Sequence, residues 1–233
     1  MLPDQKRKLM KTKKLVIFGS TLQAEVAHFL FQEDSEYEVE AFTVQKSFKD
    51  KEELFGKPIM NFEEIKEFYP PERFDLFVAL GYSQMNNLRH DFVKKAKDMG
   101  YTCPSYISSK ATTFSDFNCG ENCLILEDNT IQPFVKIGNN VTLWSGNHIG
   151  HHSKIEDNSF ITSHCVISGS CTIGRNSFLG VNCTINDKTT IAPYSLLASG
   201  SLITKDTEEA GIYIGSPAKK NENKKSIDIK ISN

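Results

Sequence analysis

The sequence has little net charge and no long apolar run. Its 233 residues carry 27 Lys and Arg against 29 Asp and Glu, so the formal net charge is −2. A balance so close to zero gives no reason to expect a nucleic acid or another polyanion as a partner. No apolar stretch approaches the ~18–20 residues needed to span a bilayer, so we expect no membrane span.

Secretion signals and zinc-type cysteine pairs are also missing. The basic start, MLPDQKRKLMKTKK, is followed only by the short apolar run LVIF and then a glycine. We therefore treat residues 1–13 as a solvated basic extension rather than a signal peptide. The six cysteines contain no C-x-x-C pair. These absences predict a reduced protein of the cytoplasm.

The second half of the chain has a period of six residues. Stepping by six from Ile125 gives an unbroken row of Ile or Leu, and the row consists of Ile125, Ile131, Ile137, Leu143, Ile149, Ile155, Ile161, Ile167, Ile173, Leu179, Ile185, Ile191, Leu197 and Ile203. The position four residues further on is almost always small. One aliphatic and one small inward position per hexapeptide is typical of a left-handed parallel β-helix, with three hexapeptides in each 18-residue coil. We predict this fold for residues 104–204.

The small row assigns several polar side chains to the interior. Cys123, Cys165, Cys171 and Cys183 lie on this row, so we expect them to fill the core rather than to act as nucleophiles. Asn129 and Asn147 lie 18 residues apart on the same row. We expect them to stack as an internal amide ladder.

The first half predicts a small parallel α/β domain over residues 14–103. KLVIFG, VEAFTV and FDLFVALG are typical of strands, and two of them end in glycine. Helices are expected between them, one carrying Leu22, Val26, Phe29 and Leu30 after a cap at Ser20 or Thr21. Ligands of such sheets bind at the carboxyl ends of the strands, which indicates Gly19–Ser20–Thr21 and Gly81–Tyr82. GSTLQA is not a dinucleotide fingerprint, so these glycines are alternatively simple turns.

Three of the six histidines fall in NHIGHH, residues 147–152. His148 lies between two inward positions and is expected to project from a flat wall of the β-helix. His151, His152 and His164 are expected at corners. A metal site needs three ligands that converge on one point, which divergent positions on one chain do not provide, so we predict no metal. A zinc site shared between subunits, with His164 contributing, is the alternative.

A glycine is predicted beside His151. Residue 169 lies one 18-residue coil beyond it and is Gly169. A glycine leaves its backbone N–H open to a ligand. A base beside an N–H donor is what acyl transfer requires, because the base takes a proton and the donor stabilises the oxyanion.

The order of the domains, HIGHHSKI and the closing IYIGSPAKK together resemble bacterial nucleotide-sugar acetyltransferases with a left-handed β-helix. The most similar families are the enzymes that N-acetylate nucleotide-linked 4-amino-4,6-dideoxy sugars, and the sialic-acid O-acetyltransferase-like proteins. The resemblance implies a Rossmann-like α/β domain, a β-helix, acetyl-CoA as co-substrate and a homotrimer with each active site between neighbouring subunits. It implies that residues 205–233 lie near coenzyme A.

The resemblance also implies roles for individual residues. His151 matches the catalytic base, and Gly169 matches the glycine whose N–H faces the thioester carbonyl. His152 stands where the family often has an acidic residue that orients the base. The segments matching the coenzyme A groove are Gly180, Val181 and Asn182, then Ala198, Ser199 and Gly200, and finally Pro217, Ala218 and Lys219. The expected nucleotide-sugar residues are Phe18, Gly19, Ser20, Gly81 and Tyr82, with His148 and His164 as further substrate contacts.

These features predict transfer of acetyl from acetyl-CoA to the amino group of a nucleotide-linked amino-deoxysugar. The attack on the thioester would be direct, with His151 as general base. The resemblance places such an enzyme in polysaccharide biosynthesis. O-acetylation of a sugar hydroxyl, as in sialic-acid-like substrates, is the first alternative. A zinc-dependent or non-enzymatic β-helix protein is the second.

Overall fold

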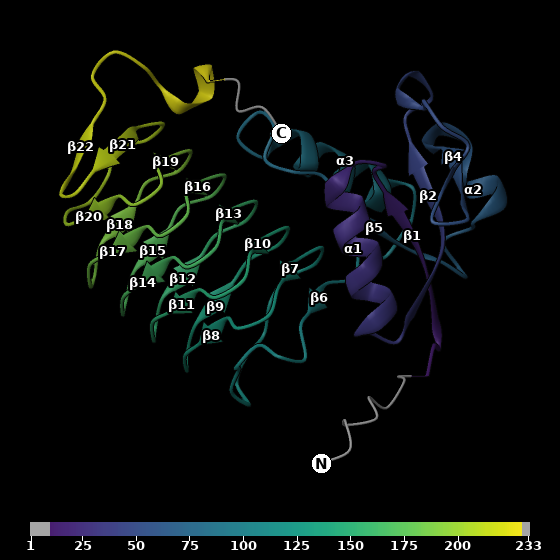
Figure 1. The fold of residues 1–233 in the computed structure, drawn as a ribbon, viewed down its shortest axis with the longest axis horizontal. Coiled ribbons are helices and arrows are strands. Elements are labelled where there is room, and N and C mark those ends of the chain that lie inside the picture. Colours follow the sequence, from purple (N-terminus) through teal and green to yellow (C-terminus); the bar gives the residue numbers. More distant parts are fainter. Residues whose placement is uncertain (1–9, 230–233) are drawn as a thin grey trace.

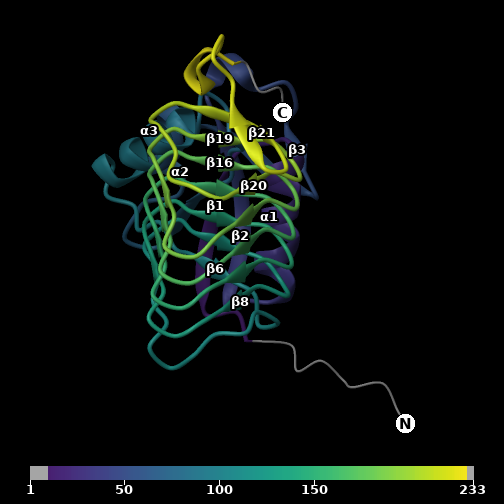
Figure 2. The same ribbon diagram turned by 90° about the vertical axis from the view of Figure 1, so that its left-hand side faces the viewer.

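The computed structural model describes residues 10–229 and consists of an α/β domain joined to a β-helix. Figure 1 shows the two parts side by side, with the stacked coils of the β-helix on the left and the α/β domain on the right. Figure 2, turned by 90°, shows the coils in front of the α/β domain. The predicted fold class, an α/β domain followed by a left-handed β-helix, is confirmed.

The α/β domain is built on a five-stranded sheet of order β3-β4-β2-β1-β5. Its strands are β1 (Lys13–Phe18), β2 (Tyr37–Val44), β3 (Glu53–Leu54), β4 (Lys57–Asn61) and β5 (Asp75–Val78). Only the β3–β4 pair is antiparallel. The buried runs of β1 and β5 are almost continuously apolar, as expected for parallel strands that are covered on both faces.

Helices cover this sheet, and the face of the first one differs from the prediction. The domain contains α1 (Leu22–Glu33), α2 (Ile65–Phe68), α3 (Asn87–Asp98), η1 (Lys46–Phe48) and η2 (Phe62–Glu64). Helix α1 buries Ala24, Ala27 and Phe31, whereas Leu22 and Phe29 are exposed. The predicted apolar stripe was therefore wrong for Leu22 and Phe29, whereas Leu30 packs against the core as predicted. Two small alanines let the helix approach the sheet closely and turn the larger side chains outward. Thr21 is the N-cap of α1, but its side chain makes no capping hydrogen bond.

The β-helix is made of two-residue strands that pair in parallel with those one coil away. The strands are β6 (Tyr106–Ile107), β7 (Leu124–Ile125), β8 (Thr130–Ile131), β9 (Lys136–Ile137), β10 (Thr142–Leu143), β11 (His148–Ile149), β12 (Lys154–Ile155), β13 (Phe160–Ile161), β14 (Val166–Ile167), β15 (Thr172–Ile173), β16 (Phe178–Leu179), β17 (Thr184–Ile185), β18 (Thr190–Ile191), β19 (Leu196–Leu197) and β20 (Leu202–Ile203). They form three walls, which contain β7-β10-β13-β16-β19, β8-β11-β14-β17-β20 and β9-β12-β15-β18.

The interior follows the two predicted rows. Every Ile and Leu of the sixfold row lies in one core cluster and is at most 6 % exposed. The four cysteines of the small row are also buried there. Asn147 Nδ2 donates to Asn129 Oδ1 at 3.0 Å, so the predicted amide ladder is confirmed.

Three corners connect the walls. We define the first corner as residues 144–147, 162–165, 180–183 and 198–201, the second as 150–153, 168–171 and 186–189, and the third as 138–141, 156–159, 174–177 and 192–195. The third residue of most of these turns has a positive φ, for example 61° at His152 and 63° at Asn158. Asparagine tolerates this left-handed conformation better than most residues, which explains its frequency at the corners.

The sheet continues beyond the predicted end of the β-helix at residue 204. Strand β21 (Ile212–Gly215) pairs in parallel with β19, and β22 (Ala218–Lys220) returns antiparallel to β21. The pairing Leu197↔Tyr213 spans 16 residues rather than 18. This last turn therefore lacks the period of six, although it closes the same wall. A short helix, η3 (Ser226–Asp228), follows.

A buried arginine joins the two domains at the third corner. Arg89 of α3 is 2 % exposed, and its guanidinium donates to Asn140 Oδ1 at 2.9 Å and to the Asn140 carbonyl at 3.0 Å. It also donates to the carbonyls of Leu80 and Gly81. Asn140 belongs to a second ladder, formed by Asn122, Asn140, Asn158 and Asn176. The α/β domain is thus fixed along one corner of the β-helix.

Candidate active site

The imidazole of His151 lies against Gly169 of the next coil, at the second corner. A Cβ atom placed on Gly169 would meet His151 Cε1 at 2.7 Å and Nε2 at 2.8 Å. The stacking predicted from the 18-residue period is therefore present. The absence of a side chain at Gly169 leaves the space that the imidazole occupies.

His152 contacts the other side of the same imidazole. The two Nδ1 atoms are 3.1 Å apart, and the rings are nearly perpendicular, at 86°. One Nδ1 must carry a proton for this to be a hydrogen bond. If His151 is the donor, its Nε2 is left unprotonated, which is the tautomer a general base needs. His152 is itself packed on the Phe134 ring, whose centroid is 4.7 Å away.

The backbone N–H of Gly169 is not open to a ligand, contrary to the prediction. It donates to Asp187 Oδ1 at 2.7 Å. Asp187 lies one further coil along the same corner and is exposed. Sequence reasoning missed this residue, although the same step of 18 that leads from His151 to Gly169 leads on to Asp187. An oxyanion can use this N–H only after the carboxylate has moved.

The segments expected to line the coenzyme A groove lie together in pairs at the first corner. Gly180 N–H donates to the Leu197 carbonyl and Gly200 N–H to the Val181 carbonyl, both at 2.8 Å. A Cβ on Gly180 would lie 2.6 Å from Ser199 N, so this position requires glycine for close stacking. Pro217, Ala218 and Lys219 belong to the β21–β22 hairpin, and Ala198 of this corner donates its N–H to the Tyr213 carbonyl of β21 at 2.9 Å.

The two lysines of that hairpin differ in their surroundings. Lys220 Nζ forms an ion pair with Glu208 at 2.6 Å. Lys219 is exposed, and its neighbour across the hairpin is Ile214. Only Lys219 therefore presents an unpaired ammonium among the described residues of this hairpin, which suits it better than Lys220 to meet a phosphate.

The two loops expected to hold the nucleotide sugar lie side by side at the carboxyl edge of the sheet. A Cβ on Gly19 would be 2.9 Å from the Ala79 carbonyl, so the chains of β1 and β5 meet closely here. Gly19 has a φ of 129°, which also favours glycine. Tyr82 packs edge-on against Phe160 and Phe178 of the β-helix, with ring centroids 5.0 and 4.9 Å away.

One chain does not bring the loops and the histidine together. The α/β domain contacts the wall of β13 and β16 and the third corner. The second corner, with His151, connects the other two walls and is therefore the corner opposite that wall. A site that uses both parts needs a second copy of the chain.

Two further histidines lie near the second corner, His148 on the adjoining wall and His164 at the first corner. His148 is half-buried on β11 and pairs in register with Val166 of β14. His164 lies over Gly146, where a Cβ would meet its Nδ1 at 2.5 Å. Among residues 10–229, no group of three His, Cys, Asp or Glu is arranged to hold a metal ion.

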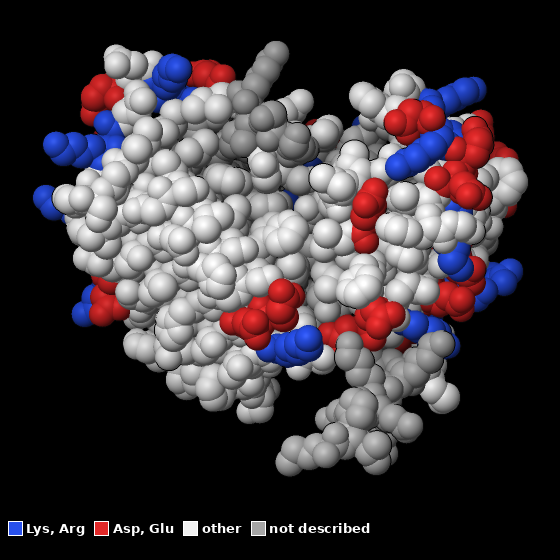
Figure 3. Space-filling model, viewed as in Figure 1, with Lys and Arg blue, Asp and Glu red and all other residues white. Residues whose placement is uncertain are grey.

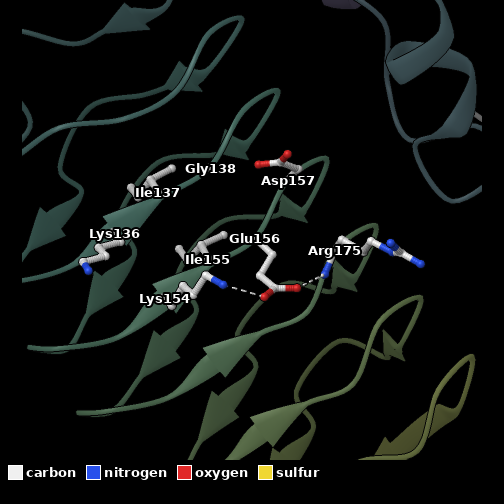
Figure 4. A pocket seen from close by; sticks show the side chains of 8 residues that line it. All are labelled: Lys136, Ile137, Gly138, Lys154, Ile155, Glu156, Asp157 and Arg175. Atoms are coloured by element: carbon white, nitrogen blue, oxygen red, sulfur yellow. Dashed lines mark hydrogen bonds and ion pairs between the residues drawn. The ribbon is translucent and has the colours of Figure 1, made fainter.

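A shallow depression of about 310 Å³ lies elsewhere, on the wall of β9, β12 and β15. Figure 4 shows its side chains, with Glu156 joined to Lys154 and to the backbone of Arg175. The Lys154–Glu156 ion pair is 2.7 Å long. The lining contains none of the predicted site residues, so we do not include this depression in the candidate site.

Comparisons with known proteins agree with the fold. A profile of the bacterial transferase hexapeptide family (six repeats) matches residues 134–169. A variant of perosamine N-acetyltransferase from Caulobacter crescentus, in complex with CoA and GDP-perosamine, has a TM-score of 0.81 and 20% identity, covering 90% of this chain and 97% of its own. The acetyltransferase domain of PglB from Neisseria gonorrhoeae FA1090 has a TM-score of 0.78 and 20% identity, covering 90% and 100%.

The same PglB domain in complex with acetyl coenzyme A has a TM-score of 0.79 and 19% identity, covering 90% and 100%. No curated protein sequence matches the chain. No helix within the described part of the chain is long and apolar enough to cross a membrane. Residues 134–169 thus match the bacterial transferase hexapeptide profile, and the chain has the two-part fold of these solved structures.

Proposed function

We propose that the protein transfers the acetyl group of acetyl-CoA to the amino group of a nucleotide-linked amino-deoxysugar. The observation that carries the proposal is the position of His151, which lies against Gly169 with its Nδ1 held by His152. Further support comes from the likeness to acetyltransferase structures that contain CoA and GDP-perosamine. In this function residues 14–103 bind the nucleotide sugar, residues 104–204 carry out the transfer, and residues 205–229 lie beside coenzyme A; the rest of that predicted segment, 230–233, is outside the described residues.

His151 acts as the general base in this mechanism. Its Nε2 takes a proton from the nitrogen of the acceptor, the nitrogen attacks the thioester carbonyl, and the C–S bond breaks to release coenzyme A. An amine is a good nucleophile and a thiolate a good leaving group, so no covalent enzyme intermediate is needed. His152 orients the imidazole and accepts the Nδ1 proton, as a carboxylate does in other enzymes with a histidine base.

The active unit is a homotrimer in which neighbouring subunits share each site. Support comes from the opposite positions of the α/β domain and of His151 on one β-helix. The turn 126–129 below the first corner contains Glu127 and Asp128, but the first corner itself carries no charged residue, which favours packing of this part against another copy. The face seen in Figure 3 likewise has few charged side chains over the β-helix. Cyclic symmetry then produces identical grooves for the extended pantetheine arm.

Within such a groove, the remaining predicted contacts have definite roles. Gly180, Val181, Asn182 and Ala198, Ser199, Gly200 line the path of coenzyme A, and Pro217, Ala218 and Lys219 lie near its phosphates. Phe18, Gly19, Ser20, Gly81 and Tyr82 hold the nucleotide. His148 and His164 contact the acceptor between the two corners. The cofactor is acetyl-CoA, and the reaction uses no metal.

A thiol-release assay tests this function. Acetyl-CoA is supplied with nucleotide-linked 3-amino or 4-amino deoxysugars and with the matching hydroxy sugars. Release of coenzyme A with an amino sugar, together with a mass increase of one acetyl group in that sugar, is the expected result. Release with the hydroxy sugars alone would change the assignment to O-acetylation. Failure of acetyl-CoA to bind in calorimetry would overturn the acetyltransferase assignment.

A further inference from the structure

Asp187 is an exposed carboxylate at the corner that carries His151, and no described Lys or Arg forms an ion pair with it. Its Oδ1 accepts the Gly169 N–H at 2.7 Å. Within residues 10–229 it forms no ion pair, although Lys188 follows it in the chain. Lys205 and Asp206 follow β20 in the chain. Asp206 Oδ1 accepts a hydrogen bond from the Thr190 N–H at 2.8 Å. His151 and His152 are the titratable groups on the coils below.

The carboxylate and the imidazole lie on two sides of one glycine. The His151 ring contacts the position where a Gly169 side chain would begin, and Asp187 holds the N–H of the same residue. An acceptor nitrogen that approaches His151 Nε2 therefore comes within reach of Asp187. Of the two described residues seen against this imidazole, Gly169 donates to Asp187, and His152 has no carboxylate among its hydrogen-bond partners.

An amine acceptor requires an anionic group, such as the Asp187 carboxylate, beside it. A primary amine on a saturated carbon has a pKa of roughly 8 to 10, so it is mostly an ammonium ion near neutral pH. An ammonium ion in a groove between subunits loses water and needs an anionic acceptor to compensate. A sugar hydroxyl carries no charge and has no such need.

We propose that Asp187 binds the ammonium group of the acceptor sugar and thereby selects an amine over a hydroxyl. This inference rests on the proposed acetyl transfer. When the carboxylate turns toward the ammonium, it releases the Gly169 N–H to the thioester carbonyl. The order of events explains why this N–H is occupied in the protein without substrate.

The protons and bonds balance in this scheme. The ammonium gives one proton to His151 Nε2, and the neutral nitrogen attacks the carbonyl carbon. The new C–N bond forms as the C–S bond breaks, and the thiolate takes up the second proton lost by the nitrogen. His151 returns its proton to solvent. The products are the acetylated sugar, coenzyme A and one proton.

The test compares Asp187→Asn with the wild-type protein and with Asp157→Asn. The asparagine keeps an acceptor oxygen for the Gly169 N–H but removes the charge. Asp157 is a matched control, because its Oδ1 caps the Asn139 N–H at 2.8 Å in the same way, at the third corner, where there is no histidine. The readouts are KM for the amino sugar at pH 6.5 and pH 9.5, the Kd of acetyl-CoA, and the melting temperature.

At pH 6.5 we expect Asp187→Asn to raise KM for the amino sugar about 10- to 100-fold, the usual contribution of a hydrogen bond to a charged group. The ratio to wild type should be smaller at pH 9.5, where a larger fraction of the acceptor amine is neutral than at pH 6.5. Asp187→Asn should leave the Kd of acetyl-CoA unchanged. Asp157→Asn should leave KM for the amino sugar unchanged. An unchanged KM at pH 6.5, or the same ratio at both pH values, would overturn the role of Asp187. Wild-type turnover with amino sugars is measured first, so that failure of the N-acetyltransferase proposal is seen separately.

Discussion

The imidazole of His151 occupies the space that a side chain at position 169 would fill. Gly169→Ala should therefore push the imidazole away from its position without disturbing the fold, since the three nearest atoms all belong to the side chain of His151. Because a small misplacement of a catalytic group is costly, we expect kcat to fall about 100-fold. Steady-state kinetics and circular dichroism of the purified variant check both parts of this prediction.

The double variant provides the control. If Gly169→Ala acts through the histidine, it should have no further effect once His151→Ala is in place. His151→Ala alone should lower kcat by about 10²–10⁴-fold, as expected for a lost general base. Independent, additive losses in the double variant would show that the alanine acts elsewhere.

The contact between His151 and His152 predicts two different outcomes at position 152. Asparagine suits the positive φ of 61° but does not support the imidazole in the same way, so His152→Asn should lower kcat about tenfold. His152→Asp places a carboxylate beside the ring and stabilises its protonated form. The acid limb of the pH–rate profile should then move to higher pH. A profile that does not move in His152→Asp would show that this side chain does not act on the base.

Much of this site could be predicted from the sequence, because the β-helix converts sequence spacing directly into spatial stacking. A step of 18 residues placed Gly169 on His151 and Asn147 on Asn129, and both relationships are present. The occupied N–H of Gly169 was not predicted, since it depends on the direction in which one exposed side chain turns. The buried face of α1 was predicted wrongly because a helical period of 3.6 residues is compatible with more than one apolar face. Only packing against the sheet determines that Ala24 and Ala27 are buried.

The junction between the domains also lies beyond sequence reasoning. Arg89 and Asn140 are 51 residues apart, in segments with different periodicities, and nothing in either segment identifies the other. Strand β21 was missed for a related reason, since KDTEE interrupts the repeat and the pairing resumes with a different spacing.

A shared active site predicts that two inactive proteins can restore each other. His151→Ala removes the base, and Ser20→Trp blocks the edge of the α/β sheet, so each should be inactive alone. If each site takes its base from one subunit and its sugar-binding domain from the next, random mixing of equal amounts should recover about a quarter of wild-type activity. Co-expression with two different tags and purification of mixed assemblies provides the sample. No recovery in a mixed assembly would place the whole site in one chain.

The buried guanidinium at the domain junction predicts a selective loss of stability. Burial lowers the pKa of Arg89 to about 10, so it remains charged at neutral pH and depends on the acceptors around it. Arg89→Met would leave those carbonyl and amide oxygens without a donor, and we expect the free energy of unfolding to fall by about 1–3 kcal/mol. Thermal or urea denaturation measures the change. Arg175→Met, at an exposed position, is the control and should change stability by less than about 0.5 kcal/mol.

The cysteines should differ in their reactivity with iodoacetamide. A hydrogen bond from the Cys123 thiol lowers the pKa of Cys119, which is only partly buried, whereas burial raises the pKa of Cys103 to about 12. Because the thiolate is the reactive form, Cys119 should be alkylated first at pH 8 and Cys103 should remain unmodified. A hydrogen bond from Cys165 also lowers the pKa of Cys183, but that thiol is 0% exposed.

Peptide mass spectrometry over time gives the order of modification. Cys119→Ser should remove the fast phase and leave the rest unchanged. Early modification of Cys183 would mean that the coils open readily, which would contradict the closed core described above.

The pairing of each strand with its neighbour 18 residues away limits how this chain can change in length. A deletion or insertion of one residue would turn inward positions outward along every later coil. Removal or addition of a whole coil would keep each column of side chains and move the outer parts along the axis by about 4.8 Å. The distance between the α/β domain and any functional group on a later coil can therefore change only in steps of one coil.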